Sequence, residues 1–177
     1  MTYTFYDGTV PLFKEALESL RAIIKEGEKY AAEKSLPADD ILNWRLAEDM
    51  LPFAFQIHMT ADVAVKLVAR VQDEAPEEWA YTDIKTLADA YARIDTAEKR
   101  LAAANRETFE KRTDATVTLQ MGPHIKKDVA ARGWAECYGL PNVFFHLTTA
   151  YAILRSKGVP LSKVNYITPF TKPWFQL

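Results

Sequence analysis

The sequence holds 177 residues, the size of one domain, of which 49% are hydrophobic and 26% charged, as in ordinary globular proteins. A formal net charge of −2 argues against a nucleic-acid partner, and the single cysteine, Cys137, excludes an internal disulfide and a multi-cysteine zinc site. Since no secretory signal is visible and no uncharged apolar run reaches the ~18 residues of a membrane span, we expect a cytoplasmic protein without a membrane partner.

The first predicted helix spans Pro11–Lys34. Apolar residues recur there every three or four positions, and charged residues fill most of the gaps. That spacing is typical of an amphipathic helix with one buried face, and Pro11 suits its first turn. A short helix around residues 41–44 is expected next, with Asp39 or Asp40 as its cap.

The second predicted helix spans Glu48–Gln72, with Pro52 in its first turn. Its apolar residues go almost all round, which indicates a central and largely buried helix. Polar residues interrupt this apolar surface, and burying them without partners costs about 1–3 kcal/mol each, so we expect them to be paired. By helical angle they form two stripes, one with Asp49, Gln56 and Thr60 and the other with His58 and Asp62.

The third predicted helix spans Thr82–Ala104 and has Thr82 as its cap. The pattern then changes to alternating β-rich residues, which predicts a small hairpin over Ala115–Lys127 with a turn at residues 122–123. A short helix over Asp128–Tyr138, closed by Gly139, follows.

The last long helix is predicted over Pro141–Lys157. The tail, Val159–Leu177, is rich in aromatic residues and is expected to pack on the rest of the molecule. The sequence therefore predicts a mainly α fold, a four-helix bundle with a small β-hairpin before the last long helix, in a single domain over residues 1–177.

The chemical candidates lie on the second and fourth long helices. Asn142 and His146 are one turn apart, so they share a face. His146 could be an acid or base, a metal ligand or a satisfied core residue. Gln56, Asn142 and Asp49 could orient a ligand beside it or only form a buried network. His58 and Asp62 could be a metal-ligand pair, a histidine oriented by a carboxylate, or a boundary pair without chemistry.

Two stretches resemble the signatures of a known family. Residues 45–57 resemble the pattern R-L-x-x-D-M-x-P-x-x-x-Q-[IV], and residues 140–155 resemble its second signature. The family is domain of unknown function 1993 (DUF1993), which is similar in fold to the DinB/YfiT helical bundles. The resemblance implies that fold, a pocket between the second and fourth helices, and a possible homodimer.

The resemblance also implies where a metal would lie. Many DinB-like proteins hold a divalent metal with one histidine on the second helix and an H-x-x-x-H pair on the fourth. Here Asn142 replaces the first histidine of the pair, His146 matches the second, and Gln56 or His58 matches the position on the second helix. We therefore expect no tightly bound metal, and at most a weak divalent ion at His146, His58 or Asp62.

These observations favour a small-molecule binder or enzyme of unknown substrate. His146 would be its acid/base residue, and Gln56, Asn142, Asp49 and His58 would contact the ligand. One alternative is a divalent-metal-dependent DinB-like hydrolase or transferase. Another is a structural or stress-associated interaction protein whose buried polar residues only fix helix register.

Overall fold

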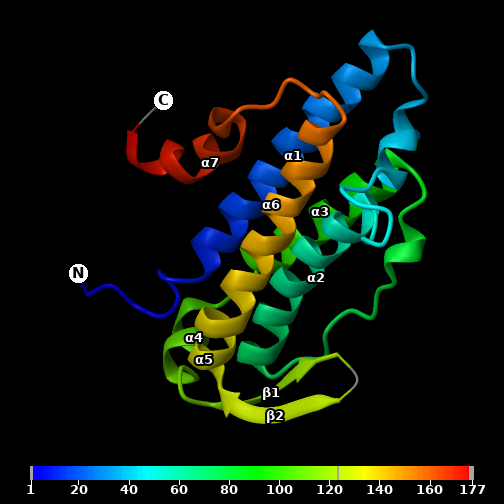
Figure 1. The fold of residues 1–177 in the computed structure, drawn as a ribbon. Helices are drawn as coiled ribbons and strands as arrows, with labels where there is room; N and C mark the ends of the chain where they lie inside the picture. Colours follow the sequence, from blue (N-terminus) through cyan, green and yellow to red (C-terminus); the bar gives the residue numbers. More distant parts are fainter. Residues whose placement is uncertain (1, 123, 176–177) are drawn as a thin grey trace.

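The computed structural model describes residues 2–122 and 124–175. Four long helices lie side by side in this part of the chain, and a two-stranded hairpin crosses one end of the bundle (Figure 1). The long helices are α1 (Val10–Glu33), α2 (Phe53–Gln72), α3 (Leu87–Ala102) and α6 (Leu140–Ser156). This arrangement confirms the predicted fold: a mainly α bundle with a hairpin before the last long helix of the four.

The shorter elements connect the long helices or cover them. They are η1 (Ala38–Asn43), η2 (Tyr81–Asp83), α4 (Arg106–Lys111), β1 (Thr116–Met121), β2 (Ile125–Ala130), α5 (Ala131–Trp134), the π-helical turn η3 (Ala135–Gly139) and α7 (Lys163–Phe175). Short helix η1 was predicted, and α4 was not. None of the helices in the described residues has the length and apolarity of a membrane span.

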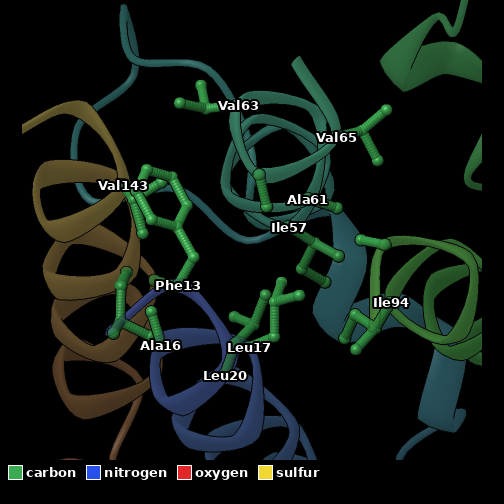
Figure 2. Close-up of a cluster of buried hydrophobic side chains, with 14 of the residues drawn as sticks. Phe13, Ala16, Leu17, Leu20, Ile57, Ala61, Val63, Val65, Ile94 and Val143 are labelled. Carbon is green, nitrogen blue, oxygen red and sulfur yellow. The ribbon is translucent and has the colours of Figure 1, made fainter. Parts of the chain in front are cut away.

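The bundle core fills the space between the long helices (Figure 2). Phe13 and Leu17 of α1 meet Ile57 of α2 there, and all three side chains are fully buried. Ile94 of α3 and Val143 of α6 close the cluster from the other helices. Because α2 contacts both α3 and α6, nearly all of its surface is covered, as its all-round apolar pattern predicted.

Helix α2 begins later than predicted. Pro52 is extended, with ψ of 174°, and the first helical residue is Phe53, so the prediction of a start at Glu48 was wrong. Proline disfavours helical geometry in the residue before it, which makes Leu51 the last residue of a loop rather than of a first turn. The loop end is fixed by the Phe53 N–H, which donates to the carbonyl of Trp44 at 2.8 Å.

Helix α3 also begins later, because a better cap lies four residues beyond the predicted one. The Thr86 side chain accepts from the Asp89 N–H at 3.1 Å, and Asp89 accepts from the Thr86 N–H at 2.8 Å. The corresponding partner of Thr82 is Lys85, which has no acceptor atom and cannot complete a capping box. Thr82 lies instead in the short turn η2.

The segment between hairpin and α6 differs most from the prediction. Strand β2 extends to Ala130, so Asp128 is a strand residue paired with Thr118, and the helix predicted from Asp128 starts at Ala131. Gly139 does not end that helix, because π-helical turn η3 carries the chain directly into α6. A Cβ at Gly139 would lie 3.2 Å from the ring of Trp134 and 3.3 Å from that of Phe13, so glycine here permits close packing.

The aromatic tail packs on the bundle, as predicted. Helix α7 lies against α1 (Figure 1), and the ring of Phe170 is 5.8 Å from that of Phe144 on α6. Trp174 at its end is 78% exposed. The last two residues of the predicted tail, and Pro123 of the predicted turn, lie outside the described residues.

Candidate functional site

His146 of α6 and Gln56 of α2 form a direct hydrogen bond across the interface of the two helices. The distance between His146 Nδ1 and Gln56 Oε1 is 2.7 Å. The amide nitrogen of Gln56 donates to the carbonyl of Leu51 at 3.2 Å. Because that carbonyl can only accept, it fixes which end of the amide faces His146, and the imidazole must donate from Nδ1.

This bond determines the protonation state of His146. With the proton on Nδ1, the lone pair lies on Nε2, which has no hydrogen-bond donor among the described residues. Burial, with a smaller contribution from His58, lowers the pKa of His146 to about 4. The ring is therefore neutral at pH 7 and has one acceptor atom without a partner among the described residues.

His58, on the other side of α2, has the opposite arrangement. The guanidinium of Arg93 on α3 donates to His58 Nδ1 at 2.8 Å. Arginine cannot accept, so the lone pair lies on Nδ1 and the proton on Nε2. Burial lowers the pKa of His58 against the opposing effect of the Asp62 carboxylate, and the positive charge of Arg93 adds a smaller lowering.

Arg93 also fixes the loop before α3. Its Nη2 donates to the carbonyl of Ala80 at 3.3 Å and lies 3.7 Å from the carboxylate of Asp83. Its Cζ lies 4.5 Å from the centre of the Trp79 ring. This single buried side chain therefore joins His58 to the loop that covers α2 and α3.

The ring of Phe55 contacts both imidazoles. Its centre lies 5.7 Å from that of His146 and 6.2 Å from that of His58. His58 of α2 and His146 of α6 are thus neighbours of one aromatic side chain. Their hydrogen bonds go to different helices, from Arg93 of α3 to His58 and from His146 to Gln56 of α2.

A cavity of about 420 Å³, here called the α2 cavity, runs along α2 from His58 towards the hairpin. From α2 it is lined by His58, Met59, Asp62, Val63, Lys66 and Arg70. The opposite wall is formed by Trp134 and Tyr138, and the hairpin contributes Gln120 and Gly122. Because the two hairpin residues are exposed, the cavity opens to the surface at the hairpin.

The charged residues of the α2 cavity differ in whether they have an ion-pair partner. Asp62 and Lys66 form an ion pair one turn apart. Arg70 donates from Nε to the carbonyl of Thr118 at 3.1 Å, and its Cζ lies 4.8 Å from the centre of the Trp134 ring. Among the described residues, no carboxylate lies within ion-pair distance of Arg70. Burial lowers its pKa, against a smaller effect of Asp62.

The structure brings some of the predicted site residues together and separates others. Gln56 contacts His146, but neither lines the α2 cavity, whereas His58 and Asp62 do. Asn142 is half-buried on the helix of His146. Asp49 is exposed in the loop before α2, so its predicted place on a helical stripe with Gln56 was wrong. Thr60 bonds within its own helix, to the carbonyl of Gln56 at 2.9 Å.

The sequence pattern did not predict four residues of the site: Arg93, Lys66, Arg70 and Tyr138. Lys66 and Arg70 could have been predicted, because residues 58, 62, 66 and 70 are spaced by four and lie along one face of α2. Arg93 falls on the buried face of α3 with Ala90 and Ala97, a position where a charge requires a partner. Tyr138 lies in the unpredicted π-helical turn.

The residues named for a metal do not fit one as they are arranged. The Nδ1 lone pair of His58 is used by Arg93, Asp62 is paired with Lys66, and His146 has Asn142 where a second histidine would be needed. No group of three His, Cys, Asp or Glu side chains in residues 2–122 and 124–175 could hold an ion.

Comparisons with known proteins agree with this fold. A family model described as "Domain of unknown function (DUF1993)" matches residues 5–167. The crystal structure of a DinB family member protein from Shewanella denitrificans is 31% identical, covers 92% of this chain and 90% of that one, and superposes with a TM-score of 0.81. No curated protein matches.

Proposed function

This chain belongs to the DUF1993 family, and we propose that it binds a small molecule in the α2 cavity. The observation that supports this proposal is a cavity of about 420 Å³ that reaches the surface, within the size range of ligand sites. Its lining combines apolar side chains with a few polar groups fixed in place by their neighbours. Such an open cavity is not expected in a bundle whose polar residues only set helix register.

The polar groups of the α2 cavity are suited to orient a ligand. Arg93 holds His58 with its Nε2–H free to donate, and no acceptor for that proton lies among the described residues. Met59 and Val63 offer an apolar surface beside it. A ligand with an acceptor group and an apolar body would match this wall without any rearrangement of α2.

A second candidate is catalysis at His146, favoured by the unpartnered Nε2 lone pair. Gln56 fixes the ring orientation, and Asn142 lies one turn away to contact a substrate. A pKa of about 4, however, makes His146 a weak base at pH 7, because general bases are most effective near the working pH. The geometry therefore supports a hydrogen-bond acceptor for a ligand better than a proton-abstracting base.

A metal-dependent hydrolase or transferase receives less support, because the proposed ligand residues are engaged elsewhere. Asp49, in its exposed loop, can contact a ligand only from outside the helices.

The test is binding of the neutral fluorophore N-phenyl-1-naphthylamine. We expect saturable binding with one molecule per chain, and loss of that binding in Met59→Trp, which fills the cavity. The control Val164→Trp adds the same indole at an exposed position of α7, 66% accessible, and should bind normally. If Met59→Trp does not fold, Gln120→Trp at the exposed rim serves instead. Equal binding by the filled and control variants would overturn the proposal.

A further inference from the structure

The α2 cavity contains one positive charge without an ion-pair partner among the described residues. Four lining residues follow one another at intervals of four along α2: His58, Asp62, Lys66 and Arg70. His58 is neutral in its bond with Arg93, and the charges of Asp62 and Lys66 cancel in their ion pair. Arg70 remains, without a carboxylate within ion-pair distance among the described residues.

The guanidinium of Arg70 is held in place by two contacts. It lies on the ring of Trp134, and its Nε donates to the carbonyl of Thr118 in β1. Nη1 has only a long contact of 3.5 Å to the carbonyl of Lys66, and Nη2 has no acceptor among the described residues. Because Nε is occupied, the edge formed by Nη1 and Nη2 is the one left to bind a carboxylate through two parallel hydrogen bonds.

Other donors of the cavity wall also lack acceptors. His58 Nε2–H has none among the described residues, and the buried indole N–H of Trp134 has none either. His58 and Arg70 are twelve residues apart, which corresponds to about 18 Å along the helix axis. The wall thus has donors towards both ends and apolar side chains between them.

We infer that the α2 cavity takes an elongated organic acid, whose carboxylate pairs with Arg70 and whose apolar body lies along Met59, Val63 and Trp134. This inference rests on the binding function proposed above and adds the class of ligand. A carboxylate is favoured over a phosphate monoester because it carries one negative charge, which matches the one charge left uncompensated. Pairing would also offset the cost of burying the guanidinium, which lowers the pKa of Arg70.

The first experiment compares two probes with the same rings in the wild-type protein. One is 8-anilinonaphthalene-1-sulfonate, which has one negative charge, and the other is the neutral N-phenyl-1-naphthylamine. We expect the anionic probe to bind about tenfold tighter or more, as a charge-assisted contact would give. Saturable binding of both probes with equal affinity would overturn the assignment of an acid, while leaving the proposed binding function intact.

The second experiment locates the charge. Arg70→Gln should weaken binding of the anionic probe about tenfold or more and change binding of the neutral probe less than about twofold. The matched control is Arg112→Gln, because Arg112 also donates from Nε to a backbone carbonyl, that of Val71, but does not line the cavity. Equal losses in both variants, or none in Arg70→Gln, would overturn the role of Arg70. If Arg70→Gln does not fold, the wild-type comparison decides.

The third experiment distinguishes the anionic groups. 1-Naphthaleneacetate and 1-naphthyl phosphate each compete with the anionic probe, and we expect the carboxylate to displace it at lower concentration. Stronger displacement by the phosphate would overturn the carboxylate assignment. If neither probe binds saturably, the proposed function itself fails, which is a different result from equal binding.

Discussion

His58 and His146 carry their ring protons on opposite nitrogens. Arg93 donates to Nδ1 of His58 and leaves the proton on Nε2, whereas Gln56 accepts from Nδ1 of His146 and leaves the lone pair on Nε2. Both rings contact Phe55. One aromatic side chain is thus flanked by a histidine that can donate and a histidine that can accept.

The titration of His146 tests this arrangement. We expect its ring signals in NMR to titrate near pH 4, below the ordinary 6.5, because burial opposes its charge. Gln56→Glu would place a carboxylate at Nδ1 and raise the pKa of His146 by about one unit or more. Gln72→Glu makes the same change at the far end of α2 and should leave His146 unaffected. A midpoint near 6.5 in the wild type would contradict the buried neutral ring.

The same shift predicts how stability depends on pH. Between about 6.5 and 4 the unfolded chain binds a proton at His146 that the folded chain does not. The free energy of unfolding should therefore be fully retained above pH 6.5 and fall as the pH decreases through this window. Urea denaturation at several pH values measures it, and His146→Asn should flatten the dependence. An unchanged slope in that variant would assign the loss to other groups.

Arg93→Met should lower the free energy of unfolding by about 1.5–3 kcal/mol, the usual value for a buried hydrogen bond to a charged group. Arg93 is 9% exposed and binds both His58 and the carbonyl of Ala80. The pKa of His58 should rise in this variant, since Arg93 lowers it. As the control, Arg21→Met removes ion pairs to exposed carboxylates and should cost about 0–1 kcal/mol. Equal costs would show that Arg93 is not a buried anchor.

Thr86→Ala should lower the free energy of unfolding by about 1 kcal/mol, because it removes the capping box of α3. Thr82→Ala deletes the same hydroxyl at the exposed position where sequence alone placed the cap, and should cost less than about 0.5 kcal/mol. Denaturant midpoints of the two variants measure the difference. A larger loss of stability in Thr82→Ala than in Thr86→Ala would show instead that α3 begins at Thr82.

Treatment with EDTA should leave the melting temperature of untagged protein nearly unchanged. The reason is the engagement of His58 by Arg93 and of Asp62 by Lys66, which leaves His146 as a lone imidazole. A structural metal stabilises the fold by its binding free energy, so its removal would lower the melting temperature sharply. Near-stoichiometric zinc or nickel after purification would overturn this prediction.

The fold could be predicted because hydrophobic periodicity is a local signal. The all-round apolar pattern of residues 53–72 indicated a central helix, and alternation over residues 116–121 indicated a strand. The ends of elements were less accurate because they depend on single competing contacts. Thr86 rather than Thr82 caps α3, because the carboxylate of Asp89 completes its capping box. The residues before Pro52, which were predicted as the start of α2, form a loop.

The candidate site could be predicted only in part. The two family signatures on facing helices predicted Gln56 or His58 near His146, and the structure has the contact with Gln56. The α2 cavity could not be predicted, because its walls come from α2, the hairpin, α5 and η3, which are brought together by tertiary packing. The buried position of Arg93 depends likewise on the loop around Trp79, far from any motif.

The π-helical turn η3 sets the rotational phase of everything before it on that continuous helix. A π turn adds one residue to an otherwise regular α-helical winding. If the same residues wound as a plain α-helix, Trp134 would turn by about 100° relative to His146. The indole beneath Arg70 would then leave the cavity wall. One extra residue in this turn, rather than any side chain, thus sets the orientation of Trp134 relative to His146.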